Sequence, residues 1–334
     1  MTAPQLILHI GRHKSGTSSL QSYLTGARRH LDRQGVLYPK AGCGTGLAHH
    51  DIAVQCHPVP SDGAALNGIA EAIRAELEPH HDRILLSSEA FQNLPDLTRL
   101  RGFARALGAG DIRVLCYVRE HLDYAMSGYR QMVQNQPRFV PFHKYLRGLG
   151  DMAPFVARWR DLGDLTLGWY DRSVLKDADI IADVCARLDI DPGEIPQGDK
   201  NPSIGGNLLA YKLAVNKLEL PGHPPPAYRI LRDLALEHAP FRAGFHIADA
   251  DAARLRAHSV YNASLAAILG PPPRIRSWVD SPVLPQLDTL ERDMQRICAA
   301  ATPGVQPPRR LIKVIPRAGH WLRPFSTPSG GVPR

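Results

Sequence analysis

The feature that most limits the fold is a strand, a glycine-containing loop and a helix that follow one another at the N-terminus. Residues 5–10 (QLILHI) form a short apolar run, which is typical of a buried β-strand. Residues 11–17 (GRHKSGT) form a turn with two glycines, and residues 18–31 have the apolar spacing of a helix. This order is the first half of a βαβ unit, which predicts a parallel sheet.

The same alternation continues along the chain. Further strands are predicted at residues 35–39, 83–88, 112–118 and 165–170, and helices at 69–77, 100–107, 121–133, 155–159 and 180–188. Strands alternating with helices predict an α/β fold: a three-layer, P-loop-type parallel sheet with helices on both faces. The carboxyl ends of its strands would then share one edge, where such sheets bind ligands.

The domain organisation follows from where this alternation stops. From about residue 201 the pattern is mainly helical. We therefore expect a single domain over residues 1–301, with its motifs within 5–205 and a mainly helical part at 206–301. Residues 302–334 are rich in Pro, Arg and Gly, which predicts a flexible, largely extended tail.

Composition excludes several classes of protein. Hydrophobic residues make up 44% of the 334 residues, which is enough to build a core without disulfides or metals. The five cysteines are scattered and form no CxxC, which argues against a disulfide framework or a zinc site. No ligand spacing supports a His–Asp metal site either, so no metal is expected. No apolar run approaches the roughly 20 residues of a membrane span, and no leader pattern precedes the first strand. We therefore expect a cytoplasmic protein without a membrane span.

The net charge of +8 favours an anionic partner. Nucleic acid is not the expected one, because no dense Lys/Arg run with interleaved aromatic residues occurs. An acidic glycan, an anionic membrane or a polyphosphorylated nucleotide fits the charge equally well. A mildly basic surface without a binding role is the simpler interpretation of charge alone.

The loop after the first strand carries the strongest functional signal. Backbone N–H groups of such a loop, together with the N-terminus of the next helix, form a cradle for an anion. Lys14 adds a positive charge, and Ser15, Thr17 and Ser18 add hydroxyl donors. The ATP-type loop has its lysine directly after the last glycine, whereas Lys14 precedes Gly16 here. The pattern predicts a phosphate or sulfate site; an ordinary turn with a surface lysine is the alternative.

The segment HIGRHKSGTSSLQ resembles the 5'-phosphosulfate loop of the PAPS-dependent sulfotransferases, most closely the bacterial and glycan-modifying branch. PAPS is 3'-phosphoadenosine-5'-phosphosulfate. The resemblance implies PAPS as the sulfuryl donor and places Lys14 on its phosphosulfate bridge. The residues that it implies for binding this group are Arg12, Lys14, Ser15, Gly16, Thr17, Ser18 and Ser19.

A second family motif follows at the expected place. Arg119 ends the third long strand pattern, and Ser127 lies eight positions later in the next helical pattern. In the family, an Arg and a Ser so spaced bind the 3'-phosphate, and a guanidinium is well suited to phosphate oxygens. Weaker similarities lie at 169–171 and 200–203. The C-terminal "R-K-G" segment of the cytosolic branch has no clear counterpart.

Glu89 is the first candidate for the catalytic base, because it directly follows the strand at 83–88. The resemblance agrees, since glycan sulfotransferases generally use a glutamate. His50, with its neighbour His49, is the alternative, because a neutral imidazole accepts protons near pH 7. Lys14 would neutralise charge on the bridging oxygen. Glu89 as a cap or an ion-pair partner is the structural alternative.

The predicted function is transfer of a sulfuryl group from PAPS to a hydroxyl or amine. The acceptor would be a small molecule or a glycan, and the resemblance favours a carbohydrate or glycolipid. Two alternatives stay open: a P-loop kinase or other nucleotide-binding protein with an unusual loop, and a non-catalytic binding protein on the same scaffold.

Overall fold

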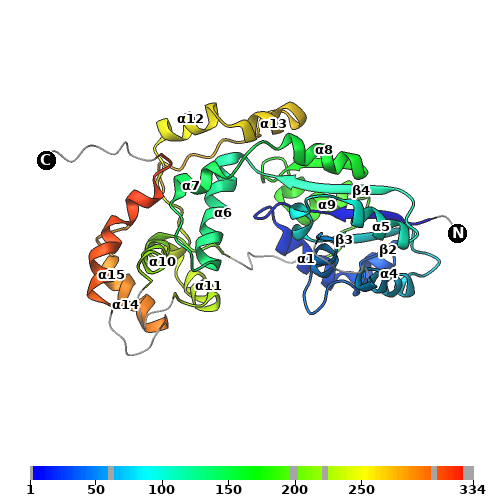
Figure 1. The fold of residues 1–334 in the computed structure, drawn as a ribbon, viewed down its shortest axis with the longest axis horizontal. Helices are drawn as coiled ribbons and strands as arrows, with labels where there is room; N and C mark the ends of the chain where they lie inside the picture. The colour runs from blue at the N-terminus through cyan, green and yellow to red at the C-terminus, as the bar shows by residue number, and fades with distance from the viewer. Residues whose placement is uncertain (1–2, 59–63, 196–201, 220–224, 302–306, 326–334) are drawn as a thin grey trace. The chain divides into compact units, whose positions relative to one another are not determined.

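The computed structural model describes residues 3–58, 64–195, 202–219, 225–301 and 307–325. Five parallel strands form one sheet in the order β2-β3-β1-β4-β5 (Figure 1). The strands are β1 (Gln5–His9), β2 (Val36–Leu37), β3 (Arg83–Ser87), β4 (Ile112–Val118) and β5 (Asp164–Trp169). Helices cover both faces of this sheet, so the predicted three-layer α/β class is confirmed.

The strand order puts a switch point beside β1. The chain leaves β1 towards the edge strand β2, but it leaves β4 towards β5 on the opposite side. Connections that depart in opposite directions open a crevice between the carboxyl ends of the two neighbouring strands. The loops that follow β1 and β4 therefore flank the position where a sheet of this kind binds its ligand.

Alternating side chains of the strands supply the two faces of the core. Ile7, Leu85 and Leu115 pack with α1 (Thr17–Gly26), α2 (Arg28–Asp32) and α9 (Ile180–Arg187). Leu8 and Leu86 point to the other face and are fully buried. Right-handed crossovers place α4 (Ala64–Glu76), α5 (Thr98–Ala106) and α8 (Ala153–Leu162) on that face. Helix α3 (His50–Cys56) contacts α4.

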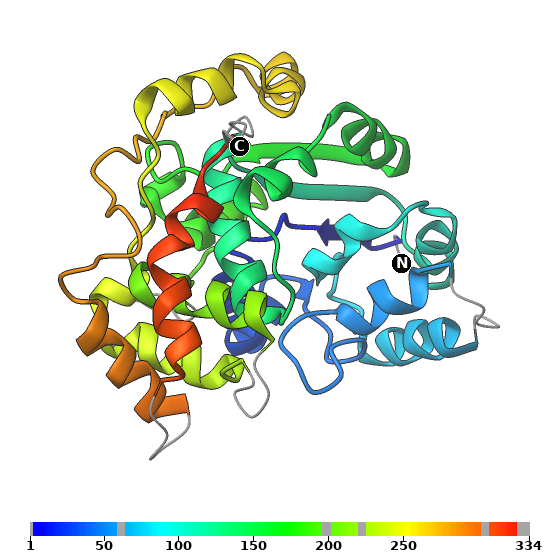
Figure 2. The same cartoon turned by 60° about the vertical axis from the view of Figure 1, so that its left-hand side comes forward.

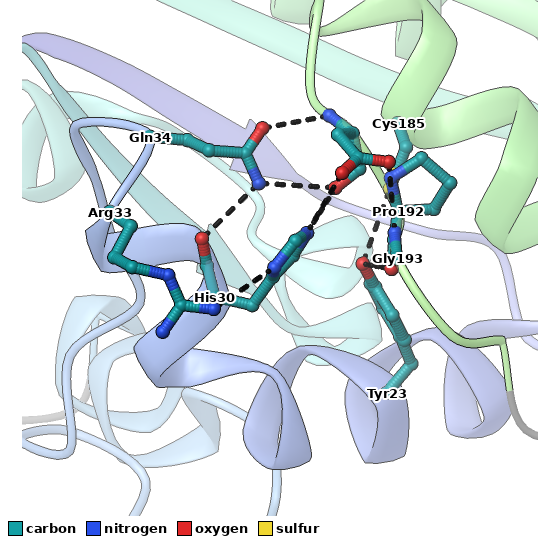
Figure 3. Close-up of polar contacts among 8 residues, drawn as sticks. Tyr23, His30, Arg33, Gln34, Cys185, Pro192 and Gly193 are labelled. Carbon is teal, nitrogen blue, oxygen red and sulfur yellow. Dashed lines mark hydrogen bonds and ion pairs between the residues drawn. The ribbon is translucent and has the colours of Figure 1, made fainter.

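The segment after α9 is held against the first two helices by hydrogen bonds to its backbone (Figure 3). The Tyr23 hydroxyl donates to the carbonyl of Pro192 at 2.7 Å, and His30 Nε2 donates to the carbonyl of Asp191 at 2.8 Å. Gln34 accepts from the N–H of Asp191 at 2.8 Å. These bonds satisfy polar backbone groups on both sides of Pro192, which fixes the exit of the chain from the sheet.

Contacts divide the chain into two compact units, where the sequence predicted one domain. The first comprises residues 1–119, 151–200 and 264–274 and contains the sheet. The second comprises residues 120–150, 201–263 and 275–334 and is helical. Its main helices are α6 (His121–Asn135), α7 (Phe142–Arg147), α10 (Gly206–Leu218), α11 (Tyr228–Glu237), α12 (Asp249–Ala257) and α14 (Leu290–Ala301). Helix α13 (Val260–Leu269) crosses the boundary. The described part of the chain contains no helix with the length and apolar character to cross a membrane.

The C-terminal segment differs from the extended tail that its composition predicts. Residues 309–322 are helical, as α15 (Arg309–Val314) and the 3₁₀ segment η4 (Ile315–Leu322), drawn in red in Figure 2. Both contact α10. The buried side chains follow a helical spacing and belong to the core of the second unit: Leu311, Ile315, Ala318 and Leu322. Residues 302–306 and 326–334 of the predicted tail lie outside the described residues.

Candidate functional site

The loop between β1 and α1 has the backbone of an anion cradle. Gly11, Lys14 and Gly16 all have positive φ, at 43°, 67° and 76°. A Cβ on Gly16 would lie 2.7 Å from the Tyr170 ring, so only glycine fits there. Gly16 is also the N-cap of α1 and, as glycine, leaves the first N–H groups of the helix without a side-chain cap. Positive φ at a lysine is uncommon, and such strain is concentrated at functional sites.

The Ser15 side chain closes the turn by hydrogen bonds to the backbone of Arg12. The N–H of Arg12 donates to Ser15 Oγ at 3.2 Å, and the Ser15 hydroxyl donates back to the Arg12 carbonyl. Ser15 is fully buried, and Thr17 is nearly so, whereas Ser18 is exposed. Ser15 thus shapes the loop from inside, and Ser18 lies on its solvent side.

Arg119 lies against this loop from the neighbouring strand. Its Nη1 donates to the carbonyl oxygen of Lys14 at 2.7 Å, and its guanidinium carbon lies 5.2 Å from the centre of the Tyr170 ring. The end of β4 and the loop after β1 are therefore joined by a hydrogen bond at the switch point. Ser127 lies on α6 in the second unit, and its pairing with Arg119 stays a prediction.

Glu89 begins the short 3₁₀ segment η1 (Glu89–Asn93) directly after β3. Its side chain is 19% exposed. One carboxylate oxygen, Oε2, accepts from Gln21 Nε2 at 2.8 Å, and the other, Oε1, lies 3.9 Å from His50 Nε2. The carboxylate is therefore neither in the core nor fully solvated, which suits a proton acceptor that must meet a substrate.

His49 and His50 have different environments. His49 is fully buried, its Nδ1 accepts from the N–H of Ser87, and burial lowers its pKa to about 4. His50 begins α3, is 46% exposed and has its Nδ1 2.7 Å from Ser88 Oγ. Only His50 faces Glu89, so the two rival candidates for the base lie side by side and His49 belongs to the core.

Two further histidines respond to the Glu89 charge. Burial lowers the pKa of His9 to about 4, and the Glu89 carboxylate opposes that shift. Burial also lowers the pKa of His13, and Glu89 again opposes it. His9 Nδ1 lies 2.8 Å from Ser87 Oγ, and its Nε2 has no hydrogen-bonding partner among the described residues. Sequence reasoning assigned neither histidine a role, and also missed Gln21.

Metal-ligand spacing occurs among the described residues at Asp32, His80 and His81, at the opposite edge of the sheet. His81 Nε2 lies 2.8 Å from Asp32 Oδ1, while its Nδ1 accepts from the N–H of Glu78 at 2.9 Å. An imidazole that accepts at Nδ1 carries its proton on Nε2 and cannot offer that atom to a metal. Hydrogen bonding therefore explains this cluster better than a metal does.

The structure brings most of the predicted site residues to the carboxyl edge of β1, β3 and β4. They are Arg12, Lys14, Ser15, Gly16, Thr17, Ser18, Ser19, His50, Glu89 and Arg119. Lys200 and Asn201 of the weaker similarity lie outside the described residues. Comparison with known proteins found no matching family model, no matching curated protein and no matching solved structure.

Proposed function

We propose that the protein is a sulfotransferase that moves a sulfuryl group from PAPS to a hydroxyl or amine of a carbohydrate or glycolipid acceptor. The observation that carries the proposal is the hydrogen bond from Arg119 to the carbonyl of Lys14. This bond joins the loop that carries Lys14 to the end of β4, which carries Arg119, at the switch point of the sheet. A donor with a 5'- and a 3'-phosphate would require a positively charged side chain at each of these two places. Cytoplasmic localisation belongs to the same proposal.

The residues would divide the chemistry as follows. The N–H groups of Lys14 and of residues 16–18 bind the 5'-phosphosulfate, because the N–H of Ser15 already donates to the Arg12 carbonyl, and Arg119 binds the 3'-phosphate. Glu89 accepts the proton of the acceptor as the new bond to sulfur forms. The bond from sulfur to the bridging oxygen breaks, and its electron pair stays on the 5'-phosphate. Lys14 neutralises that charge, so the scheme needs no divalent cation.

The position of the lysine favours this reaction over phosphoryl transfer. An ATP-type loop presents its lysine on the helix, after the last glycine, next to a hydroxyl that binds magnesium. Here Lys14 lies within the loop at positive φ, and Thr17 takes the place after Gly16. Ser18 then falls at the place of the magnesium-binding hydroxyl, but the lysine that precedes this hydroxyl in the ATP-type loop is missing.

Calorimetric titration with 3',5'-adenosine bisphosphate and with ATP, each with and without magnesium, tests the donor site. We expect binding of the bisphosphate that does not depend on magnesium. Lys14→Ala and Arg119→Ala should each weaken it about 10- to 100-fold, the usual loss for a hydrogen bond to a charged group.

Arg105→Ala is the matched control, because Arg105 is an exposed arginine on the last turn of α5, which leads to the amino end of β4. It removes the same charge without touching the site, so affinity should stay within twofold. Magnesium-dependent ATP binding in preference to the bisphosphate would instead favour the kinase alternative. Transfer of labelled sulfate from PAPS then separates an enzyme from a non-catalytic binding protein.

A further inference from the structure

Gln21 connects the helix of the anion loop to Glu89. It lies on α1, four residues after Thr17, and therefore on the same helical face one turn later. Its side chain is 5% exposed, so it has almost no access to water. Its Nε2 donates to Glu89 Oε2 at 2.8 Å. A carboxylate only accepts hydrogen bonds, so the amide must present its N–H₂ group to Glu89.

The two oxygens of Glu89 consequently differ. Oε2 is held by a buried side chain on a helix. Oε1 lies 3.9 Å from His50 Nε2, beyond hydrogen-bonding distance. His50 is itself placed by Ser88, whose Oγ lies 2.7 Å from its Nδ1 and also accepts the N–H of Ala90 at 3.2 Å. One oxygen is therefore anchored, and the other is available for a proton.

We propose that Gln21 is a positioning residue that fixes the Glu89 carboxylate and so assigns Oε1 as the atom that accepts the acceptor's proton. The inference rests on the proposed function. Proton transfer depends steeply on geometry, and a carboxylate with two rotatable bonds beyond Cβ reaches that geometry only if one oxygen is held. Because Gln21 and the anion loop share α1, the base is positioned by the same helix whose N-terminus faces the donor.

The kinetic test uses PAPS with water as the acceptor and measures the release of labelled sulfate. Gln21→Met keeps the length of the side chain and removes the donor. We expect kcat to fall about 10- to 100-fold, a part of the usual contribution of a general base, while the dissociation constant for the bisphosphate stays within twofold.

Gln92→Met is the matched control, because Gln92 is a buried glutamine three residues from Glu89 whose Nε2 has no hydrogen-bonding partner among the described residues. It should keep the wild-type kcat.

A second variant separates positioning from simple loss of packing. Gln21→Glu donates to Glu89 only when its new carboxyl group is protonated. The ratio of its kcat to that of the wild type should therefore rise as the pH falls from 8 to 5.5, whereas the ratio for Gln21→Met should stay flat. A wild-type kcat in Gln21→Met, or equal losses of kcat and bisphosphate affinity, would overturn the proposal.

A third measurement does not depend on activity. In a double-mutant cycle of Gln21→Met and Glu89→Met, the unfolding constants in urea should be non-additive by about tenfold. Additive effects would mean that the two side chains do not interact, which contradicts the proposal. If the cycle shows coupling but the wild type neither binds the bisphosphate nor releases sulfate, the proposed function fails, and the role of Gln21 in turnover fails with it.

Discussion

At the scale of single residues, the Glu89 charge is the centre of the candidate site. It opposes the effect of burial on the pKa of both His9 and His13. It also lies 3.9 Å from a nitrogen of His50. The titration of His9 and His13 therefore reports where the carboxylate is, without any substrate.

Glu89→Gln should lower the pKa of His13 further below its ordinary value. The replacement removes the negative charge that favours the imidazolium form, while burial, the larger cause, remains. We therefore expect the midpoint of the His13 titration to move to lower pH in Glu89→Gln than in the wild type. Histidine Cε1–H signals followed by NMR from pH 4 to 8 measure it.

Glu78→Gln is the control for this titration. Glu78 lies 3.6 Å from His80 at the other edge of the sheet, so its loss removes an equal charge near a different histidine. The pKa of His13 should not change. If it were also unchanged in Glu89→Gln, the Glu89 carboxylate would not lie where the structure has it.

A residue of the site can be predicted from the sequence when it directly follows a strand. Glu89 and Arg119 follow apolar strand patterns, so chain order alone assigns them to one edge. Gln21 and His9 are different, because their partners are set by the pairing of His9 with Ser87 and by the rotation of α1. His9 is a single polar residue in an apolar strand pattern, and Gln21 is one of several polar residues in its helix, so the spacing of neither shows its partner.

At the scale of elements, the periodic patterns predict the strands well and the helix ends poorly. The helix predicted over residues 18–31 is two helices, α1 and α2, that meet at Ala27, where φ is −90° and ψ is 7°. Gly26 precedes that junction, and glycine is a weak helix former.

The helical segment at residues 309–322, which the sequence analysis missed, did carry a signal: Leu311, Ile315, Ala318 and Leu322 recur at intervals of four and three residues. Flanking prolines and arginines masked it.

The helical state of residues 309–322 can be tested with two isoleucines. Ile315 is fully buried in the core of the second unit, whereas Ile312 is 50% exposed. Ile315→Ala should lower the free energy of unfolding by about 2–4 kcal/mol, through lost transfer energy and a cavity. Ile312→Ala removes the same atoms from a solvent-facing position and should cost less than about 1 kcal/mol. Urea denaturation compares the two variants. Equal small losses of unfolding free energy would contradict the buried helical state and favour the extended tail that the composition predicts.

At the scale of the whole molecule, the parallel sheet follows from the sequence, but most of the division into units does not. The boundary between residues 200 and 201 coincides with the change to a mainly helical pattern, but no such change marks the boundaries at residues 119–120 and 150–151. Each unit gathers distant segments, and such long-range packing depends on tertiary contacts that local periodicity does not encode.

The stability of the molecule should depend on pH through two histidines buried in the first unit. His9 and His49 both have their pKa lowered to about 4, mainly by burial, against an ordinary value of 6.5. Above pH 6.5 they are neutral in both the folded and the unfolded chain, and their contribution is complete. Between pH 6.5 and 4 the unfolded chain binds protons that the folded chain does not. The free energy of unfolding therefore decreases as the pH decreases through this range.

The pKa difference for each histidine corresponds to about 3 kcal/mol lost by pH 4. Urea unfolding at pH 7, 6 and 5 should show a falling midpoint in the wild type. His49→Gln cannot take up a proton, so it should be less stable at pH 7 but lose less stability on acidification. His57→Gln, which changes an exposed histidine of the same unit, should follow the wild type. A midpoint that stays constant from pH 7 to 5 would mean that these imidazoles are solvated, and the packing of β1 and β3 around Ser87, on which the place of Glu89 depends, would be wrong.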